Sequence, residues 1–129
     1  MIYENVAKKY LEAIQEHDYN KVMSLFDEKG LVNSPMTGEV KAEDFFKAYF
    51  DDEYNAIVSL KEIFISKFSS YSLAINFEYK AISDAKETIS IDCVDIIKLN
   101  KEGKIIYLNV IFDTHETRIL FKKLKLFEG

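Results

Sequence analysis

The sequence has little of several residue types that mark specialised folds. It contains no Trp, one Cys, one Pro and four Gly among 129 residues. A lone cysteine, Cys93, cannot form an internal disulfide, which fits a reducing compartment. Four scattered glycines cannot build a glycine-rich phosphate loop. So few glycines and prolines also leave little room for disordered or low-complexity stretches.

Other absences bear on partners and location. The net charge is −5, whereas a nucleic-acid-binding domain normally carries a basic face. No apolar run approaches the roughly 20 residues that span a bilayer. The segment from Met1 to Asn5 shows no basic stretch followed by an apolar one, so we expect no signal peptide. These features predict a cytoplasmic protein that binds neither nucleic acid nor membrane.

What the sequence does contain is typical of a globular protein. Hydrophobic residues make up 48% and aromatic residues 14% of the chain. The length lies within the usual size of one domain, so we expect a single domain spanning residues 1–129. The order of the predicted elements, helices first and hairpin-linked strands afterwards, favours an α+β fold.

Three helices are predicted in the first half of the chain. Val6, Tyr10, Ala13 and Ile14 recur at helical spacing in a helix that ends near His17. A second helix is expected from an N-cap at Asp18 to a C′ glycine at Gly30, with Val22, Leu25 and Phe26 as its apolar stripe. The third is expected from Ala42 to about Asp52, with a stripe of Phe46, Tyr49 and Phe50.

The strands follow, apart from a short one at Leu31–Val32 that reaches Ser34 and Pro35. The residues between 57 and 68 are rich in β-formers but alternate imperfectly, which predicts a bent or bulged strand. Clear strands are expected at 71–80, 87–99 and 104–112, the last two joined by a turn at 100–103. A capping box at 113–116 predicts a further helix to about residue 127.

Asp95 is the most informative residue. One face of its strand carries Ile89, Ile91, Cys93, Asp95, Ile97 and Leu99. A carboxyl in this apolar row loses hydration, which raises its pKa, and it needs a hydrogen-bond partner. Protonated, it could donate a hydrogen bond to an oxygen that gains negative charge. The alternative is a structural aspartate at an edge, or one paired with a lysine such as Lys98.

Other side chains carry weaker signals. Tyr10 lies on the apolar stripe of the first helix, so its buried hydroxyl needs a partner. Ser34, next to Pro35, could present a hydroxyl at the mouth of a pocket. His17 and His115 lack the spacing of a zinc site, so we expect no metal and no cofactor. A buried thiol such as Cys93 is usually inert.

The chain resembles the nuclear transport factor 2-like superfamily, which includes ketosteroid isomerases and SnoaL-type polyketide cyclases. The order of the elements carries the resemblance, which extends over nearly the whole chain. The similar segments are Tyr10-Leu11-Glu12-Ala13-Ile14, Leu25-Phe26, Ser34-Pro35, Val94-Asp95-Ile96-Ile97-Lys98-Leu99-Asn100, Gly103-Lys104-Ile105 and Phe112-Asp113-Thr114.

The resemblance implies a cone-shaped, curved antiparallel sheet packed on three N-terminal helices, with a C-terminal helix and a ligand pocket. It implies that Tyr10 and Asp95 polarise a ligand oxygen, and that Ser34 occupies the position of the general base. Serine is not a competent base without an activating neighbour. The implied apolar lining is Ile14, Met36, Phe46, Phe50, Ile97, Leu108, Val110 and Phe112. The resemblance also implies a homodimer through the outer face of the sheet, which would offer Tyr107 and Asn109.

Three functions remain open at this point. The protein could be an isomerase-, cyclase- or dehydratase-like enzyme that acts on a small carbonyl compound. It could be a non-catalytic receptor for a small apolar ligand with one polar end. It could also be a protein-interaction module that uses the face of its sheet. The fold alone does not separate them.

Overall fold

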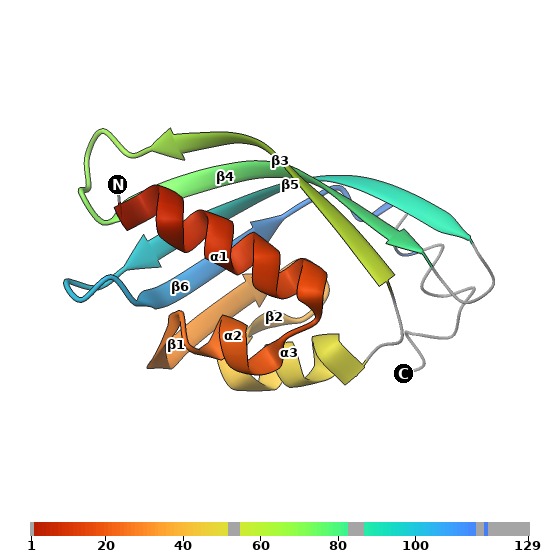
Figure 1. Ribbon diagram of the computed structural model, residues 1–129, viewed down its shortest axis with the longest axis horizontal. Coiled ribbons are helices and arrows are strands. Elements are labelled where there is room, and N and C mark those ends of the chain that lie inside the picture. The colour runs from red at the N-terminus through yellow and green to blue at the C-terminus, as the bar shows by residue number, and fades with distance from the viewer. Residues whose placement is uncertain (1, 52–54, 83–86, 116–117, 119–129) are drawn as a thin grey trace.

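The computed structural model describes residues 2–51, 55–82, 87–115 and 118 (Figure 1). These residues form three helices and a single six-stranded sheet. The helices are α1 (Ile2–Glu16), α2 (Tyr19–Met23) and α3 (Ala42–Asp51). The strands are β1 (Phe26–Ser34), β2 (Gly38–Lys41), β3 (Asn55–Ile65), β4 (Ser72–Ile82), β5 (Thr88–Leu99) and β6 (Ile105–Ile111). The predicted α+β class is confirmed.

The sheet has the strand order β2-β1-β6-β5-β4-β3 and is strongly curved. The long strands β3, β4 and β5 arch over α1, while α2 and α3 lie beside β1 and β2 (Figure 1). The helices therefore cover the concave side of the sheet, where apolar side chains can be removed from water.

One feature of the sheet corrects the prediction of an antiparallel sheet. β1 pairs with β6 in parallel, with Val32 opposite Leu108, whereas the other pairs of neighbouring strands are antiparallel. Hairpin signals reveal only strands that are close in sequence. β1 and β6 lie far apart in the chain, so no local pattern announces their pairing.

The segment between α1 and α3 also differs from the prediction. α2 begins after the N-cap Asp18, whose carboxylate accepts from the Lys21 amide at 3.0 Å, but it ends at Met23. Phe26 and Gly30, expected in and after this helix, belong to β1. β2, which was not predicted, forms a hairpin with β1, and Ser34 pairs with Gly38 across the turn. β2 is short and largely exposed, so its sequence lacks the alternation of apolar and polar residues by which a strand is predicted.

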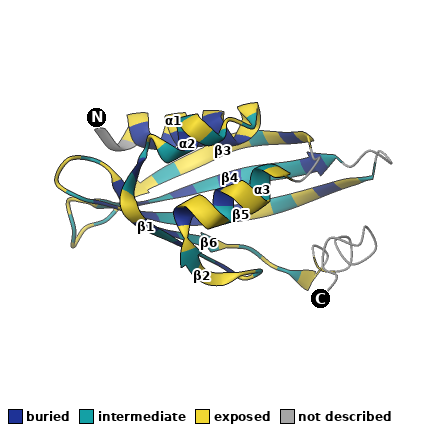
Figure 2. Cartoon of the chain, turned by 90° about the horizontal axis from the view of Figure 1, so that it is seen from below, coloured by how far each residue is buried: buried dark blue, intermediate teal, exposed yellow. Residues whose placement is uncertain are grey.

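The core forms where the predicted apolar faces meet. The α1 stripe of Val6, Tyr10, Ala13 and Ile14 is buried, and Figure 2 shows buried and more exposed residues alternating along β4 and β5. On β5 the inward row is buried or half-buried from Ile89 to Leu99, as the alternation predicts. Phe46 of α3 and Leu108 of β6 are fully buried within the same cluster.

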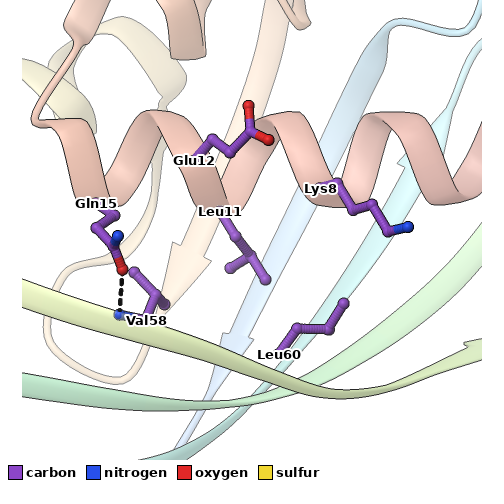
Figure 3. Close-up of a pocket in the computed structure, with 6 residues that line it drawn as sticks. All are labelled: Lys8, Leu11, Glu12, Gln15, Val58 and Leu60. Atoms are coloured by element: carbon purple, nitrogen blue, oxygen red, sulfur yellow. Dashed lines mark hydrogen bonds between the residues drawn. The ribbon is translucent and has the colours of Figure 1, made fainter.

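α1 is fixed to the edge strand β3 by a side-chain hydrogen bond. The Gln15 Oε1 atom accepts from the Val58 backbone amide at 3.0 Å, and Leu11 points toward Leu60 beside it (Figure 3). A shallow groove of about 190 Å3 remains between these residues. β3 also carries the predicted irregularity, since its register with β4 shifts between Leu60 and Glu62. Gln15 thus satisfies one amide at the open edge of the sheet.

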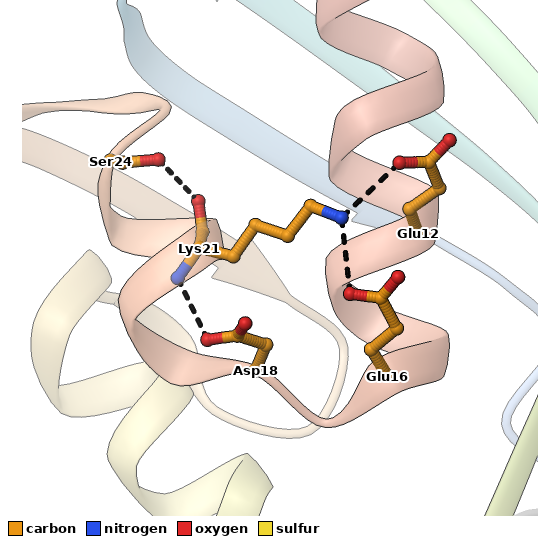
Figure 4. Close-up of polar contacts among 5 residues, drawn as sticks. All are labelled: Glu12, Glu16, Asp18, Lys21 and Ser24. Atoms are coloured by element: carbon orange, nitrogen blue, oxygen red, sulfur yellow. Dashed lines mark hydrogen bonds and ion pairs between the residues drawn. The ribbon is translucent and has the colours of Figure 1, made fainter.

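The junction between α1 and α2 is held by a small polar network on the surface (Figure 4). Lys21 pairs with Glu12 at 3.2 Å and with Glu16 at 3.0 Å, and its carbonyl accepts from the Ser24 hydroxyl at 2.6 Å. Exposed pairs of this kind contribute little to stability individually. Together with the Asp18 cap, they fix the turn that orients the end of α1.

The predicted tail helix, from the box at 113–116 to about residue 127, falls largely outside the described residues. Among the described helices, none is both long enough and apolar enough to cross a membrane.

Gly30 supplies a test of the packing between β1 and β6. A Cβ atom at this position would lie 3.0 Å from the Asp27 carbonyl oxygen and 3.1 Å from that of Ile105. Since backbone atoms cannot move aside freely, we expect Gly30→Ala to lower the free energy of unfolding by about 1–3 kcal/mol. Urea denaturation followed by circular dichroism measures the change. Lys29→Ala, an exposed neighbour on the same strand, is the control; equal stability of the two variants would contradict the close approach.

Candidate ligand-binding site

A cavity of about 530 Å3 lies between the helices and the inner face of the sheet. Its wall is mainly apolar and aromatic, with a few polar groups. The lining residues are Tyr10, Ile14, His17, Ser34, Met36, Thr37, Val40, Asp44, Phe45, Phe46, Ala48, Tyr49, Phe77, Tyr79, Ile91, Cys93, Asp95, Val110 and Phe112. This composition, apolar with a few convergent polar groups, is typical of small-molecule sites.

Asp95 stands at the boundary between this cavity and the solid core. Along β5, Cys93 and Ile91 line the cavity on one side of Asp95, whereas Ile97 on the other side is fully buried in the core. On the two neighbouring strands, the change from cavity wall to solid core falls at the same level. Ile75 of β4 and Val110 of β6 lie opposite Asp95. Asp95 therefore marks the inner end of the cavity.

Tyr10 and Asp95 are joined by a buried hydrogen bond. The Tyr10 hydroxyl donates to the Asp95 Oδ2 atom at 2.8 Å, bringing together residues 85 positions apart. Asp95 has an exposed fraction of 0% and Tyr10 of 4%. The other carboxyl oxygen, Oδ1, has no hydrogen-bond partner among the described residues. The hydrogen bond brings together the two residues that the resemblance assigns to one ligand oxygen, and Lys98 is not the partner of Asp95.

Burial dominates the electrostatics of this pair. Desolvation raises the pKa of Asp95 from 3.8 to about 7, although the hydrogen bond from Tyr10 acts in the opposite direction. Burial, followed by the neighbouring Asp95 charge, raises the pKa of Tyr10 well above its usual value. Tyr10 thus stays protonated at neutral pH, and its one hydroxyl proton is donated to Asp95. At neutral pH, both protonation states of Asp95 are accessible.

Ser34 lies in the cavity wall, but its hydroxyl is used by the turn between β1 and β2. Its Oγ atom accepts from the backbone amides of Met36 and Thr37, both at 3.2 Å. The hydroxyls of Ser34 and Thr37 are 3.0 Å apart, and that of Thr37 donates to the Gly38 carbonyl. The Ser34 proton is therefore directed to Thr37. Within the described part of the chain, Ser34 bonds to no histidine or carboxylate, and a serine needs such a neighbour to act as a general base.

The predicted lining residues divide into two groups. Ile14, Met36, Phe46, Val110 and Phe112 line the cavity. The expectation for Phe50, Ile97 and Leu108 is corrected, since none of the three lines it. Ile97 and Leu108 face one another across β5 and β6 below Asp95, where both are fully buried. Phe50 turns toward the end of α1, with its ring centroid 5.0 Å from that of His17.

Several polar residues of the wall were not predicted as site residues, among them His17, Tyr49 and Tyr79. His17, at the end of α1, has a left-handed backbone with φ of 59°. Tyr49 of α3 and Tyr79 of β4 form a hydrogen bond between their hydroxyls. Both tyrosines lie on predicted inward rows, so the pattern placed them inside. Their contact depends on how α3 crosses the sheet, which the sequence pattern does not give.

The Cys93 thiol, two residues before Asp95 on β5, also lines the cavity. Burial raises its pKa to about 12, so it remains a protonated, weakly reactive group. Within the described part of the chain, no three His, Cys, Asp or Glu side chains are grouped so that they could hold a metal ion.

Comparisons with known proteins identify the architecture. No protein-family model and no curated protein matches the sequence. Solved structures do match. A nuclear transport factor 2-like (NTF2-like) protein of unknown function from Cytophaga hutchinsonii has a TM-score of 0.67 at 17% identity, with 92% of this chain and 93% of that chain covered.

Two further similar structures have named activities or ligands. Delta 5-3-ketosteroid isomerase from Mycobacterium sp. has a TM-score of 0.73 at 14% identity, with 85% of this chain and 92% of that chain covered. Rv0760c from Mycobacterium tuberculosis, in complex with estradiol-17beta-hemisuccinate, has a TM-score of 0.73 at 18% identity, with 84% and 91% covered. At these identities the likeness concerns architecture. The chain has the nuclear transport factor 2-like fold, as the resemblance implies.

Proposed function

We propose that the protein binds a small, largely apolar molecule whose carbonyl, enol or phenol oxygen is held by Tyr10 and Asp95. The observation that carries the proposal is the buried Tyr10–Asp95 hydrogen bond at the inner end of the cavity. The second carboxyl oxygen of Asp95 has no partner among the described residues. Leaving a buried carboxyl oxygen unpaired is costly, and a ligand oxygen would relieve that cost.

The two protonation states of Asp95 suit different forms of such a ligand. Protonated, Asp95 would donate from Oδ1 to a carbonyl, enolate or phenolate oxygen. Ionised, it would accept a hydrogen bond from a hydroxyl at the same place. Either way, the apolar body of the ligand would contact side chains such as Phe46, Phe77 and Val110. The steroid ester bound to Rv0760c, a structure of the same fold, supports an apolar ligand of this general kind.

A second candidate function is acid–base catalysis in the same cavity. The pKa of Asp95, about 7, lies where a carboxyl can both give and take a proton at neutral pH. An isomerisation, cyclisation or dehydration of a small carbonyl compound would use this property, with the Tyr10 hydroxyl turning its proton from Asp95 to the substrate oxygen to polarise it. Since Ser34 is committed to its turn, Asp95 would carry the proton itself. Ketosteroid isomerase among the similar structures supports this candidate.

The outer face of the sheet supports a homodimer as a further part of the proposal. Large apolar side chains are exposed there or at the sheet edge, among them Phe64, Ile106 and Ile111, with exposed fractions between 41% and 51%. A partner subunit would remove them from water. The single cysteine supports a reducing, cytoplasmic environment for such an assembly. Sedimentation equilibrium would test the dimer, and a monomer at every concentration would refute it.

Ligand binding tests the role of Asp95 directly. We expect 2-naphthol, a rigid apolar phenol, to bind at neutral pH and Asp95→Asn to weaken it about tenfold or more, since hydrogen bonds to charged groups contribute about 1.5–3 kcal/mol. Isothermal titration calorimetry gives the affinities. Asp92→Asn is the matched control, because Asp92 lies on the same strand but bonds to Lys61 and Asn76 on the outer face. An affinity that is unchanged in Asp95→Asn would exclude the assigned role.

The pH dependence of stability tests the burial of Asp95. Because its pKa is raised from 3.8 to about 7 on folding, the folded chain binds more protons than the unfolded chain between these values. The stability of the wild type relative to Asp95→Asn should therefore fall as pH rises from about 4 to 7, and then level off. About three pKa units at roughly 1.4 kcal/mol each give a relative loss of about 4 kcal/mol.

Urea denaturation of both proteins at several pH values measures this difference, in which the contributions of other titrating groups cancel. A constant difference across the window would show that Asp95 ionises in the folded protein as it does in water.

A further inference from the structure

His17 is a polar residue of the cavity wall that the Tyr10–Asp95 site does not use. It lies directly after the last residue of α1 and lines the cavity together with Tyr10 and Ile14 of that helix. These three residues have the spacing i, i+4 and i+7, which places them on one helix face. The face of α1 that lines the cavity therefore carries two polar side chains, Tyr10 and His17, with Ile14 between them.

The backbone of His17 adopts a conformation that glycine usually provides. Its φ is 59°. The His17 amide donates to the Ile14 carbonyl at 3.2 Å, and the Asp18 amide donates to the Ala13 carbonyl at 3.0 Å. These two hydrogen bonds form a Schellman motif, whose left-handed C′ position is most often glycine. Histidine tolerates this region better than most side chains, but its Cβ atom is still strained there. A role of the imidazole accounts better for its presence than the ending of α1 alone.

The imidazole of His17 is held by aromatic contacts and has hydrogen-bonding capacity left. Its ring centroid lies 5.0 Å from that of Phe50 and 6.0 Å from that of Tyr49, both on α3. No described residue makes a hydrogen bond to either ring nitrogen. The side chain is half-buried in the cavity wall. Because each ring nitrogen donates or accepts according to the protonation state, a hydroxyl group, which can do both, suits either form.

The charges of the cavity wall favour an uncharged partner for His17. Among the described wall residues, the other side chains that can carry a full charge near neutral pH are Asp44 and Asp95, and both are carboxylic acids. An anionic ligand end would therefore meet like charge in the wall, whereas a hydroxyl would not. The seven residues from Tyr10 to His17 span about 10 Å along the helix axis. This separation suits a body of two fused rings with an oxygen at each end.

We propose that His17 binds a hydroxyl group at the end of the ligand remote from the oxygen held by Tyr10 and Asp95. The inference rests on the proposed function, because Tyr10 and Asp95 orient the first end of the ligand. It adds the ligand class, an elongated and uncharged apolar body with oxygen atoms at both ends. It also makes His17 a specificity-determining residue, because a ligand that ends in carbon would leave the imidazole without a partner.

Two probes of equal size test the role of His17. 6-(Hydroxymethyl)-2-naphthol and 6-ethyl-2-naphthol share the phenol end and differ by a hydroxyl in place of a methyl group at the other end. Isothermal titration calorimetry gives the ratio of their affinities in the wild type, in His17→Phe and in His17→Gly. The ratio should favour the hydroxymethyl compound about fivefold more in the wild type than in either variant, the contribution of one net hydrogen bond. Comparing the ratios cancels the difference in hydrophobicity between the probes.

The two variants remove the imidazole nitrogens in complementary ways. His17→Phe keeps a ring against Tyr49 and Phe50, whereas His17→Gly introduces the residue that this C′ position usually holds. Melting temperatures establish that each variant is folded. His115→Phe is the matched control, because His115 is the other of the two histidines and is not among the described residues of the cavity wall. Its ratio should equal that of the wild type.

The possible outcomes separate this inference from the proposed function. If Asp95→Asn weakens both probes but the ratio is the same in the wild type and in the folded His17 variants, the role of His17 is wrong and the proposed function stands. A ratio that falls equally in His115→Phe also overturns the role of His17. If neither probe binds the wild type, or if Asp95→Asn binds both as the wild type does, the proposed function fails and the role of His17 fails with it.

Discussion

The hydrogen bond between Tyr10 and Asp95 is the interaction on which the candidate site depends. An ionisable carboxyl is fully buried among apolar side chains, where an unpaired polar group is strongly unfavourable. Tyr10 supplies one partner from the first helix, and no other described residue supplies one for the second oxygen. The buried Asp95 carboxyl is therefore a destabilising group in the interior of the fold. Such a group is easier to understand in a ligand-binding cavity than in a core that serves only stability.

The position of Asp95 on β5 determines whether a ligand could reach its carboxyl group. Had the carboxyl stood two residues further along the strand, at Ile97, it would lie in solid core beyond the reach of any ligand. Two residues the other way, at Cys93, it would lie further along the wall of the cavity. At its actual place it closes the inner end of a largely apolar space. A ligand oxygen that reaches this end would bring the rest of the molecule against aromatic side chains of α3 and β4.

Much of the fold follows from local patterns in the sequence. The helical spacing of Val6, Tyr10 and Ile14 predicted α1 and its buried face, and the alternation around Asp95 predicted β5 and the buried carboxyl. Phe26 was misassigned because a short apolar segment fits either a helix or a strand. The parallel pairing of β1 with β6 was missed because it joins distant segments. The alternation placed Tyr79, Ile97 and Leu108 on the inner face of the sheet. Which of them face the cavity depends on the packing of distant segments, which alternation does not give.

The parallel pairing of β1 with β6 has a consequence for how the molecule assembles. β1 lies between β2 and β6 in the sheet. One side of β1 therefore stays unpaired until β6, the last strand of the sheet, is available. Contacts between such distant segments form slowly, because a long loop must close before they contribute. Since β6 pairs with β5 through a short hairpin, we expect the late step to be the docking of β1 onto β6. Asp95 on β5 would then keep its hydration until the early part of the chain, which carries Tyr10, packs over it.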